Sequence, residues 1–272
     1  MMAQVAFQGE HGAYSEQAVL IRQGHGARTQ PCRTLREVFG SVMQGRADLG
    51  VIPAENSIEG SVNETYDLLL EFPLRICGEI KLRIEHCLLA LPETAFEQLR
   101  VVYSHPQALA QCARYLSTLN VETEPTYDTA GSAKMIRERS LGDAGAIASG
   151  YAGNLYGLKV LQRNIEDFAD NFTRFFVIGQ REMSRTGVDK TTIAFGTRHE
   201  AGSLHKALGE LAKRGINLTR IESRPLRTTP WEYSFFLDFE GHASDPLCAE
   251  ALSGLKQNTT FLRVFGSYPR SG

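Results

Sequence analysis

The stretch KVLQRNIEDFADNFTRFFVIG, residues 159–179, is long and extended in character, without a convincing helix. A second stretch of the same kind, LRICGEIKLRIEHCLLAL, occupies residues 74–91. Long extended segments can cross between two lobes. Two such crossings predict one lobe from about residues 1–75 and 165–180, and a second lobe from about residues 76–164. A ligand would then bind in the cleft between the lobes.

The rest of residues 1–180 alternates between strand-like and helix-like segments. The predicted strands are VAFQG (5–9), DLGVIP (48–53), VVYSH (101–105) and AGAIAS (144–149), and the clearest helices are LREVFGSVMQG (35–45) and QALAQCARYLSTL (107–119). Such alternation predicts an α/β fold with parallel sheets covered on both faces. The first of these helices has an apolar face at helical spacing, made of Leu35, Val38, Phe39, Val42 and Met43. Thr34 with Glu37 forms a capping box for it, and Ser61 with Glu64 forms another before the predicted helix VNETYDLLLE (62–71).

The pattern changes after GQREMSRTGVDK (179–190), a polar segment that reads as a linker. Residues 191–272 then predict a ferredoxin-like βαββαβ unit. Its segments are TTIAF (191–195), SLHKALGELAKRG (203–215), INLTRIESRP (216–225), WEYSFFLDFEG (231–241), DPLCAEALSGLKQ (245–257) and TFLRVFGSYP (260–269). In the fourth segment, alternation places Tyr233, Phe235, Leu237 and Phe239 on one face. The helices cover one face of the sheet, and we expect a partner subunit to cover the other.

Composition excludes several classes of function. The net charge of −2 over 272 residues gives no electrostatic reason to expect nucleic acid or an anionic membrane as a partner. The beginning of the chain, MMAQVAFQGEHG, has neither the basic region nor the apolar core of a secretory signal. Five dispersed cysteines predict free buried thiols in a reducing cytoplasm, and the scattered histidines predict no metal site.

Three junctions between a predicted strand and a predicted helix carry polar residues: FQGEHGAYSEQA (7–18), PAENSIEGSV (53–62) and YSHPQALAQC (103–112). Each has a structural explanation, namely a tight glycine turn, an Asx turn with a helix cap, and a cap beside a solvated glutamine. Together they present hydrogen-bond donors at the carboxyl ends of strands, where open α/β sheets bind ligands. The expected ligand is a small molecule that carries an anionic group.

The segment NFTRFF (171–176) places an arginine among phenylalanines. A buried arginine requires an anionic partner. In a regular strand, Thr173 shares a face with Asn171 and Phe175, whereas Arg174 points to the opposite face. Both side chains face one ligand only if the backbone bends at this point; otherwise Arg174 forms a structural ion pair, with Glu55 or Asp170 as candidate partners.

These motifs resemble those of the prephenate dehydratases. GEHGAYSEQA (9–18), PAENSIEGSV (53–62), SHPQALAQC (104–112), NFTRF (171–175) and GSLHKALGELAKRGINLTRIESRP (202–225) occur in the family's order and span nearly the whole chain. The resemblance implies a two-lobed catalytic domain of the type II periplasmic-binding-protein kind over residues 1–180. It also implies a C-terminal ACT regulatory domain that binds L-phenylalanine. Because the chain opens on the catalytic strand, it is expected to be monofunctional.

The resemblance also implies roles for particular residues. The catalytic group is Thr173, supported by Asn56, Ser104 and Gln111. The substrate-binding residues are Gly12, Tyr14, Ser15, Glu55, Ser57, Arg174 and Phe175. The effector site is expected to comprise Gly202, Leu204, Asn217, Leu218, Glu222, Ser223 and Arg224, between two ACT domains. Ser203 and His205 depart from the family's usual G-A-L-V sequence, which bears on how tightly phenylalanine controls the enzyme.

The implied reaction converts prephenate to phenylpyruvate, with loss of CO2 and water, and requires no cofactor because aromatisation drives it. Feedback inhibition by L-phenylalanine is expected to raise the apparent KM, and the chain is expected to form dimers or tetramers. Two alternatives remain open. An arogenate dehydratase differs only in accepting an amino group in place of the keto oxygen. A non-catalytic sensor would use the same cleft and ACT domain for amino-acid binding alone.

Overall fold

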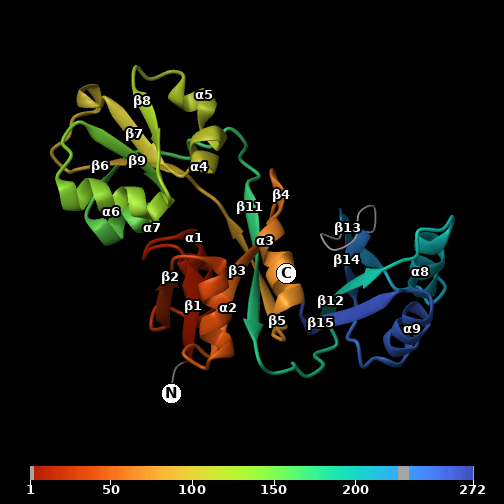
Figure 1. The fold of residues 1–272 in the computed structure, drawn as a ribbon. Helices are drawn as coiled ribbons and strands as arrows, with labels where there is room; N and C mark the ends of the chain where they lie inside the picture. Colours follow the sequence, from red (N-terminus) through yellow and green to blue (C-terminus); the bar gives the residue numbers. More distant parts are fainter. Residues whose placement is uncertain (1–2, 226–232, 272) are drawn as a thin grey trace. The chain divides into compact units, whose positions relative to one another are not determined.

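A computed structural model describes residues 3–225 and 233–271 (Figure 1). The chain divides into two compact units. The first comprises the residues up to Phe72 together with Ile80–Phe176, and the second comprises Pro73–Glu79 together with the residues from Val177 onward. No helix among the described residues is long and apolar enough to cross a membrane.

The first lobe of the first unit is built on a mixed sheet with the strand order β2-β1-β3-β11-β5. β1 pairs in parallel with β2 and β3, and helices α1 and α2 pack on these strands. The buried face of α2 carries apolar residues at helical spacing, among them Leu35, Val38 and Phe39. The elements are β1 (Gln4–Gln8), α1 (Tyr14–Gln23), β2 (Arg28–Cys32), α2 (Leu35–Met43), β3 (Leu49–Asn56), β4 (Gly60–Ser61), α3 (Asn63–Glu71), β5 (Arg75–Arg83) and β11 (Phe172–Gly179).

The second lobe has a sheet of its own, with the order β10-β6-β9-β7-β8. β7 is parallel to β8 and β9, whereas β6 is antiparallel to β9 and β10. The second sheet is therefore mixed rather than purely parallel, because β6, the strand that enters from the first lobe, runs opposite to its neighbours. The elements are β6 (Cys87–Ala90), the 3-10 helix η1 (Phe96–Gln98), β7 (Val101–Ser104), α4 (Pro106–Gln111), α5 (Ala113–Leu116), β8 (Glu122–Pro125), α6 (Thr129–Arg139), β9 (Ala144–Ala148), α7 (Gly150–Tyr156) and β10 (Lys159–Arg163).

The two extended stretches cross between the lobes as predicted, but the lobe boundary differs. β5 lies at the edge of the first sheet beside β11, so the second lobe begins near Cys87 rather than at residue 76. The first crossing is confined to residues 84–86, where the Ile84 N–H donates to the carbonyl oxygen of Asn171 at 2.8 Å. The apolar stretch 74–91 contains two strands in two sheets, and its sequence has no turn signal at the break.

Several local expectations are corrected by the structure. The Ser61–Glu64 capping box does not form, because Ser61 lies in β4 and α3 begins after Val62, which makes no side-chain cap. Thr34 does cap α2, accepting from the Glu37 N–H at 3.1 Å. Met43, expected on the buried face, is 44% exposed at the end of α2.

Two predicted boundaries shift for reasons of backbone hydrogen bonding. Pro53 does not end β3, since the pairing of β3 with β1 already stops at Val51. The helix predicted over 107–119 is divided into α4 and α5. The Gln111 carbonyl oxygen accepts from the Asp167 N–H at 2.7 Å. A donor from the second crossing thus takes the place of the N–H group that the next helical turn would supply.

The C-terminal part of the second unit is the predicted βαββαβ domain, with an antiparallel sheet in the order β13-β14-β12-β15. Its core contains Phe235, Leu237 and Phe239 of β14, as alternation predicted, whereas Tyr233 is 40% exposed. Residues 231 and 232 of that predicted strand lie outside the described residues. The elements are β12 (Asp189–Gly196), α8 (Ser203–Ala212), β13 (Leu218–Pro225), β14 (Tyr233–Glu240), α9 (Pro246–Gln257) and β15 (Phe261–Pro269).

The second face of this sheet, expected to be covered by a partner subunit, is covered in part by the chain itself. Arg75 donates from Nη1 to the Val264 carbonyl oxygen at 2.8 Å, and a Cβ added to Gly266 would overlap the Ile76 carbonyl oxygen. The carboxylate of Glu79 accepts two hydrogen bonds from Lys190 of β12, at 2.9 and 3.0 Å. Residues 73–79, which include the first part of β5, thus pack on the C-terminal sheet.

All five cysteines are free and buried, as their dispersion predicted. Burial raises the pKa of the Cys87, Cys112 and Cys248 thiols, since a thiolate would lose its hydration. These thiols therefore act as small apolar side chains of the core.

Candidate active site

A cavity of about 260 Å³ opens in the first unit. Residues of both lobes line it, together with Ile84 and His86 of the first crossing. They are Gln8, Tyr14, Ser15, Pro53, Asn56, Val62, Ile84, His86, His105, Gln107, Ala108, Gln111, Thr129, Thr173 and Phe175.

The segment NFTRFF keeps the alternation of a regular strand. Thr173 and Phe175 line the cavity, and Asn171 is fully buried on the same face. Arg174 points to the other face, where its Nη1 lies 3.6 Å from a carboxylate oxygen of Glu55 and its guanidinium lies 4.7 Å from the centre of the Phe176 ring. The backbone does not bend to bring both residues to the cavity. Arg174 and Glu55, expected to contact substrate, lie outside the cavity lining and form the structural ion pair that was the alternative.

Asn56 forms both the Asx turn expected of its motif and a hydrogen bond to the predicted catalytic residue. Its Oδ1 accepts from the N–H groups of Ile58 at 2.9 Å and Glu59 at 3.1 Å, which is the Asx turn. Its Nδ2 donates to Thr173 Oγ1 at 3.1 Å and to Asn171 Oδ1 at 2.7 Å. Because the Thr173 oxygen accepts a hydrogen bond, its own proton is available to a ligand in the cavity.

A chain of amides continues from Asn56 into the second lobe. Asn171 donates from Nδ2 to Gln111 Oε1 at 3.0 Å, and Gln111 donates from Nε2 to Glu59 Oε1 at 3.2 Å. The direction of these bonds follows from the backbone. Two N–H groups fix Oδ1 of Asn56 as an acceptor, so Nδ2 of Asn56 must face Asn171, and Nδ2 of Asn171 must face Gln111.

His86 lies at the far end of this chain and was not anticipated. It is 2% exposed, its Nε2 lies 3.0 Å from Gln111 Oε1, and its Nδ1 lies 2.9 Å from the Tyr14 hydroxyl. The Tyr14 hydroxyl also donates to the carbonyl oxygen of Glu85 at 2.9 Å. The signal that could have identified His86 is its place in HCLLAL, a lone polar side chain at the point where the chain crosses between lobes.

Burial lowers the pKa of His86 from its ordinary value near 6.5, because an imidazolium would lose its hydration. The hydrogen bond to Gln111 and the charge of Glu166, whose carboxylate accepts from the His86 backbone N–H at 2.9 Å, act in the opposite direction. Burial raises the pKa of Tyr14 well above its ordinary value. At neutral pH the cavity therefore presents a neutral imidazole and a neutral phenol.

The remaining predicted site residues fall into two groups. Tyr14 and Ser15 line the cavity, although Ser15 lies inside α1 and Ala13 is the helix cap. Gly12, Ser57 and Ser104 do not line it.

These three residues have structural contacts instead. Ser104 is fully buried and donates to the Ile147 carbonyl oxygen at 2.6 Å. Ser57 donates to the Asp170 carbonyl oxygen at 2.8 Å, which ties the Asx turn to the second crossing. Gly12, at φ +95°, packs against Ala152 of the second lobe.

The described lining contains no lysine or arginine. Its polar groups are histidines, amides and hydroxyls. Ser15 and Thr129 lie in the first turns of α1 and α6, where helix N-termini carry partial positive charge, but the Asp128 carboxylate already caps α6 by accepting from the Gly131 N–H at 2.6 Å. An anionic group in this cavity would be held by neutral donors rather than by a cationic side chain.

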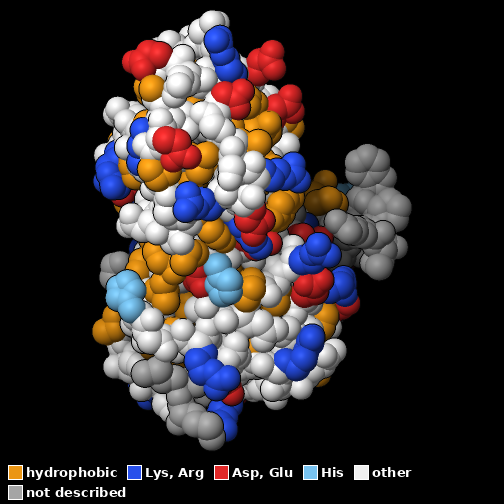
Figure 2. Space-filling view, turned by 90° about the vertical axis from the view of Figure 1, so that its left-hand side faces the viewer, with side chains coloured by type: hydrophobic (Ala, Val, Ile, Leu, Met, Phe, Trp, Pro, Cys, Tyr) orange, Lys and Arg blue, Asp and Glu red, His pale blue; other side chains and the backbone are white. Residues whose placement is uncertain are grey.

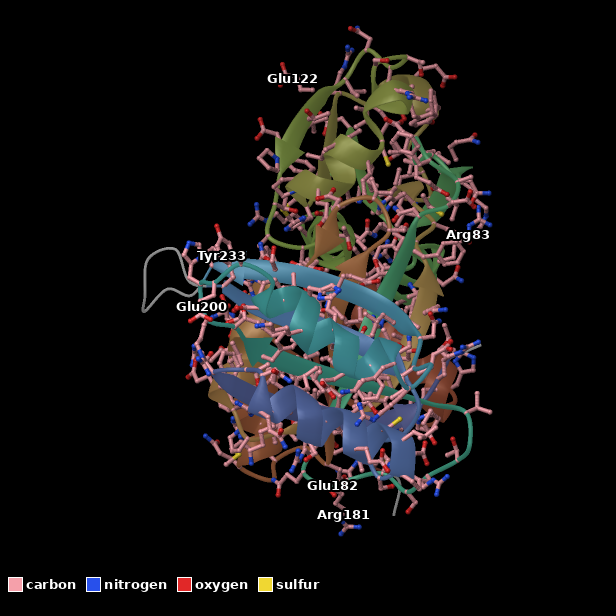
Figure 3. All side chains as sticks on the ribbon, turned by 90° about the vertical axis from the view of Figure 1, so that its right-hand side faces the viewer. Arg83, Glu122, Arg181, Glu182, Glu200 and Tyr233 are labelled. Carbon is pink, nitrogen blue, oxygen red and sulfur yellow. The ribbon has the colours of Figure 1, made fainter. Side chains whose placement is uncertain are left out.

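A second cavity, of about 370 Å³, lies in the C-terminal domain and is lined by Thr197–Glu200, Gly202–His205, Tyr233 and Phe235. Glu200 and Tyr233 lie near each other on one side of the domain (Figure 3). Of the expected effector residues, only Gly202 and Leu204 are part of its described lining. Gly202, at φ +81°, is the N-cap of α8.

The other expected effector residues are on or beside β13, and Leu218 pairs with Phe239, at the end of β14 opposite to Tyr233. Arg220 and Glu222 of this strand form an ion pair with each other. On the face shown in Figure 2, lysine and arginine side chains are interspersed with aspartate and glutamate rather than gathered in a patch of one sign.

The fold and the cavity define a two-lobed α/β protein of the type II periplasmic-binding-protein kind, with a polar ligand cleft and a βαββαβ domain attached. The chain belongs to the prephenate dehydratase family. The family "Prephenate dehydratase" matches residues 5–183, and the family "ACT domain" matches residues 191–257. The predicted fold class is thereby confirmed.

Curated relatives span nearly the whole chain. A bifunctional chorismate mutase/prephenate dehydratase of Aquifex aeolicus is 46% identical over 98% of this chain and 74% of that protein. An arogenate dehydratase/prephenate dehydratase of Arabidopsis thaliana is 44% identical over 97% of this chain and 72% of that protein.

Two solved structures are similar throughout. A prephenate dehydratase of Arthrobacter aurescens in complex with L-Phe has a TM-score of 0.90 and 34% identity, and the match covers 98% of this chain and 90% of that one. GqqA, described as a novel type of quorum quenching acylase, has a TM-score of 0.89 and 38% identity, with 98% of each chain covered.

Proposed function

We propose that this chain converts prephenate to phenylpyruvate, with loss of CO2 and water, and that L-phenylalanine inhibits it. The proposal is carried by one observation in particular. The Thr173 hydroxyl, on the family's NFTRF motif, lines the cavity and accepts from Asn56, which leaves its proton available to the substrate.

The reaction needs a proton or a strong hydrogen bond at the departing hydroxyl. The electron pair of the bond to the ring carboxylate moves into the ring as the C–O bond breaks. Hydroxide is a poor leaving group, and Thr173 supplies the donor. A threonine hydroxyl is a weak acid, so the hydrogen bond from Asn56 matters because it orients the oxygen and makes its proton more acidic.

The cavity distinguishes the two carboxylates of prephenate. We assign the pyruvyl carboxylate to the N-terminal end of α1, near Ser15, because the Asp128 carboxylate already caps the N-terminus of α6. The ring and its departing carboxylate lie against the apolar lining, which contains Ile84 and Phe175. A weakly held carboxylate leaves more readily as CO2, because stabilising it in the ground state would raise the barrier.

The test is phenylpyruvate formation from prephenate by Thr173→Val and Thr173→Ser. We expect Thr173→Val to lower kcat by about 10²–10⁴-fold, the usual contribution of a positioned proton donor. Thr173→Ser keeps the hydroxyl and should retain most of the activity. Turnover by Thr173→Val within a few-fold of wild type would refute the assignment of Thr173.

Assays with other ligands and substrates distinguish this function from three alternatives. The plant relative named for both dehydratases makes arogenate the nearest alternative, so kcat/KM is measured on both substrates. Binding of L-phenylalanine without turnover of either substrate would identify a sensor.

Release of acid from an N-acylated amine would identify an acylase. The serine and threonine hydroxyls of the described lining make no hydrogen bond to His86 or His105, so no activated nucleophile of that kind is formed in this cavity.

We also propose that the chain self-associates through its ACT domain and that this completes the effector site. Within one chain, Gly202 and Asn217 lie near opposite ends of the sheet. The eight residues of β13 run between these ends, a length of roughly 23 Å. A second copy related by a twofold axis would bring Asn217 and Leu218 of one protomer to the cavity of the other.

The exposed strand β13 suits such an interface. β13 is an edge strand of the described sheet, and its Ile221 is 45% exposed. Analytical ultracentrifugation with and without L-phenylalanine tests the assembly. A monomer that binds L-phenylalanine fully would count against it, and so would an unchanged response after Gly202→Leu or Asn217→Ala.

We propose that this chain carries the dehydratase activity alone, since the two families that match it are the dehydratase and the ACT domain. Supplying chorismate in place of prephenate tests this, because phenylpyruvate then forms only if a mutase activity is present. The cytoplasmic location expected from the free thiols stays a prediction.

A further inference from the structure

His86 joins the amide chain of the cavity to Tyr14. The amide chain runs from the Asx turn at Asn56 through Asn171 to Gln111, and His86 closes it with a contact of 3.0 Å between Nε2 and Gln111 Oε1. Gln111 Oε1 already accepts from Asn171 and can only accept again. His86 must therefore carry a proton on Nε2.

The other ring nitrogen has the complementary role. Nδ1 lies 2.9 Å from the Tyr14 hydroxyl, which shares its proton between Nδ1 and the Glu85 carbonyl oxygen at the same distance. A neutral ring with its proton on Nε2 satisfies both neighbours, because Nδ1 then accepts from Tyr14 and Nε2 donates to Gln111. The tautomer thus follows from the backbone N–H groups that fix Asn56 at the other end of the chain.

The direction of the chain bears on Thr173. If Gln111 turned its amide over, its Nε2 would face the Nδ2 of Asn171, and two donors would oppose each other. If Asn171 turned in response, its Nδ2 would oppose the Nδ2 of Asn56, which holds Thr173. Each reversal leaves buried donors unpaired, and such unpaired groups are strongly unfavourable.

We propose that His86, as the neutral tautomer protonated on Nε2, is a positioning residue that holds the Gln111 amide in the direction set by the Asn56 turn and so keeps the Thr173 hydroxyl ready to donate. The inference rests on the proposed function, since it assigns to His86 a role in the same reaction. His86 acts through Gln111, Asn171 and Asn56, and none of these three amides needs to exchange a proton.

Two substitutions separate the two nitrogens. His86→Gln places an amide N–H near the position of Nε2 and keeps the bond to Gln111. His86→Asn places its amide near Nδ1, so it keeps a partner for Tyr14 and loses the bond to Gln111. We expect His86→Asn to lower kcat by on the order of tenfold, and His86→Gln to lower it by less than about threefold, with KM changed little in both. Equal losses, or a larger loss in His86→Gln, would overturn the proposal.

A double-mutant cycle distinguishes positioning from a general structural defect. In a Thr173→Val background no hydroxyl is left to orient, so His86→Asn should lower the residual rate no further. A merely structural role would lower it by the same factor in both backgrounds, and that additive result would also overturn the proposal. Melting temperatures of all variants establish that they are folded.

A measurement independent of activity completes the test. In the wild-type protein labelled with 15N-histidine, the His86 spectrum should show a protonated Nε2 and an unprotonated Nδ1 at neutral pH, with the assignment made from His86→Gln. A proton on Nδ1 instead would refute the proposal even if prephenate were turned over. A wild type with this tautomer but no turnover of prephenate would refute the proposed function, and with it the positioning role of His86.

Discussion

Glu79 and Lys190 form a buried ion pair, and we expect the loss of either partner to destabilise the second unit strongly. The Glu79 side chain is fully buried and the Lys190 side chain is 7% exposed. Two hydrogen bonds of 2.9 and 3.0 Å join the ammonium group to the carboxylate, and the Ser271 N–H donates to the same carboxylate at 3.1 Å. Hydrogen bonds within the protein therefore take the place of water around both charges.

Lys190→Met keeps the length and apolar volume of the side chain but removes its charge. The carboxylate of Glu79 is then buried without its cation, and breaking a buried pair in this way costs about 3–5 kcal/mol. For a chain of this size, about 1 kcal/mol lowers the melting temperature by about 2–4 °C. Lys190→Met should therefore melt on the order of 10 °C below wild type.

The double variant Glu79→Leu/Lys190→Met is the decisive comparison. Replacing both charges by apolar groups of similar volume is often neutral or stabilising, because neither ion then has to be desolvated. We expect it to recover most of the loss. Arg36→Met, which breaks the exposed pair of Arg36 with Glu71, is the matched control and should change the melting temperature little.

Differential scanning calorimetry measures all four proteins under one buffer condition. Lys190→Met melting within about 2 °C of wild type would show that the pair is not isolated from water. A double variant as unstable as the single one would show that packing at this site, rather than charge, holds β5 against β12.

Three further predictions follow from the same geometry. Burial depresses the folded-state pKa of His86 below about 6.5. The stability of the fold is therefore greatest above that pH and is lost as the pH falls through the folded-state pKa. Melting scans from about pH 8 to about pH 5 should show this loss in wild type and a smaller loss in His86→Gln. Gly12→Ala should destabilise more than Gly24→Ala, since both have positive φ but only at Gly12 does an added Cβ meet atoms of α7, at 3.1 Å; equal melting temperatures would exclude the contact. The double charge variant should show a smaller rise in apparent KM with L-phenylalanine than wild type, because the pair ties β12 to the strand that leads to Ile84 in the cavity; an unchanged response in steady-state kinetics would place the coupling elsewhere.

Much of the fold could be predicted from the sequence because its signals are local. Alternating strands and helices, the two long extended stretches and the βαββαβ order were all found in the structure. The errors occurred where a distant group replaced a local one. The helix after Pro106 is interrupted because Asp167, more than fifty residues away, takes the carbonyl of Gln111. No pattern within the helix could show this.

The candidate site was predictable in part for the same reason. Thr173 and Phe175 were placed on one face of a strand by the period of two, and the structure has them there. His86 and Asn171 were missed because their importance lies in contacts with Tyr14, Gln111 and Asn56, which are far away in the chain.

The sequence by itself determined the family, the domain order and the face on which each residue of the NFTRFF strand would lie, because motif order and strand period are properties of the chain. It left open whether a bend in that strand turns Arg174 to the same face as Thr173. The tertiary structure places Thr173 in the cavity lining and Arg174 outside it, since only packing could bring Glu55 to within 3.6 Å of Arg174 and Asn56 to within 3.1 Å of Thr173. The arginine pairs with a carboxylate, because a buried charge requires one. The threonine keeps a free proton, because an amide from another strand satisfies its oxygen.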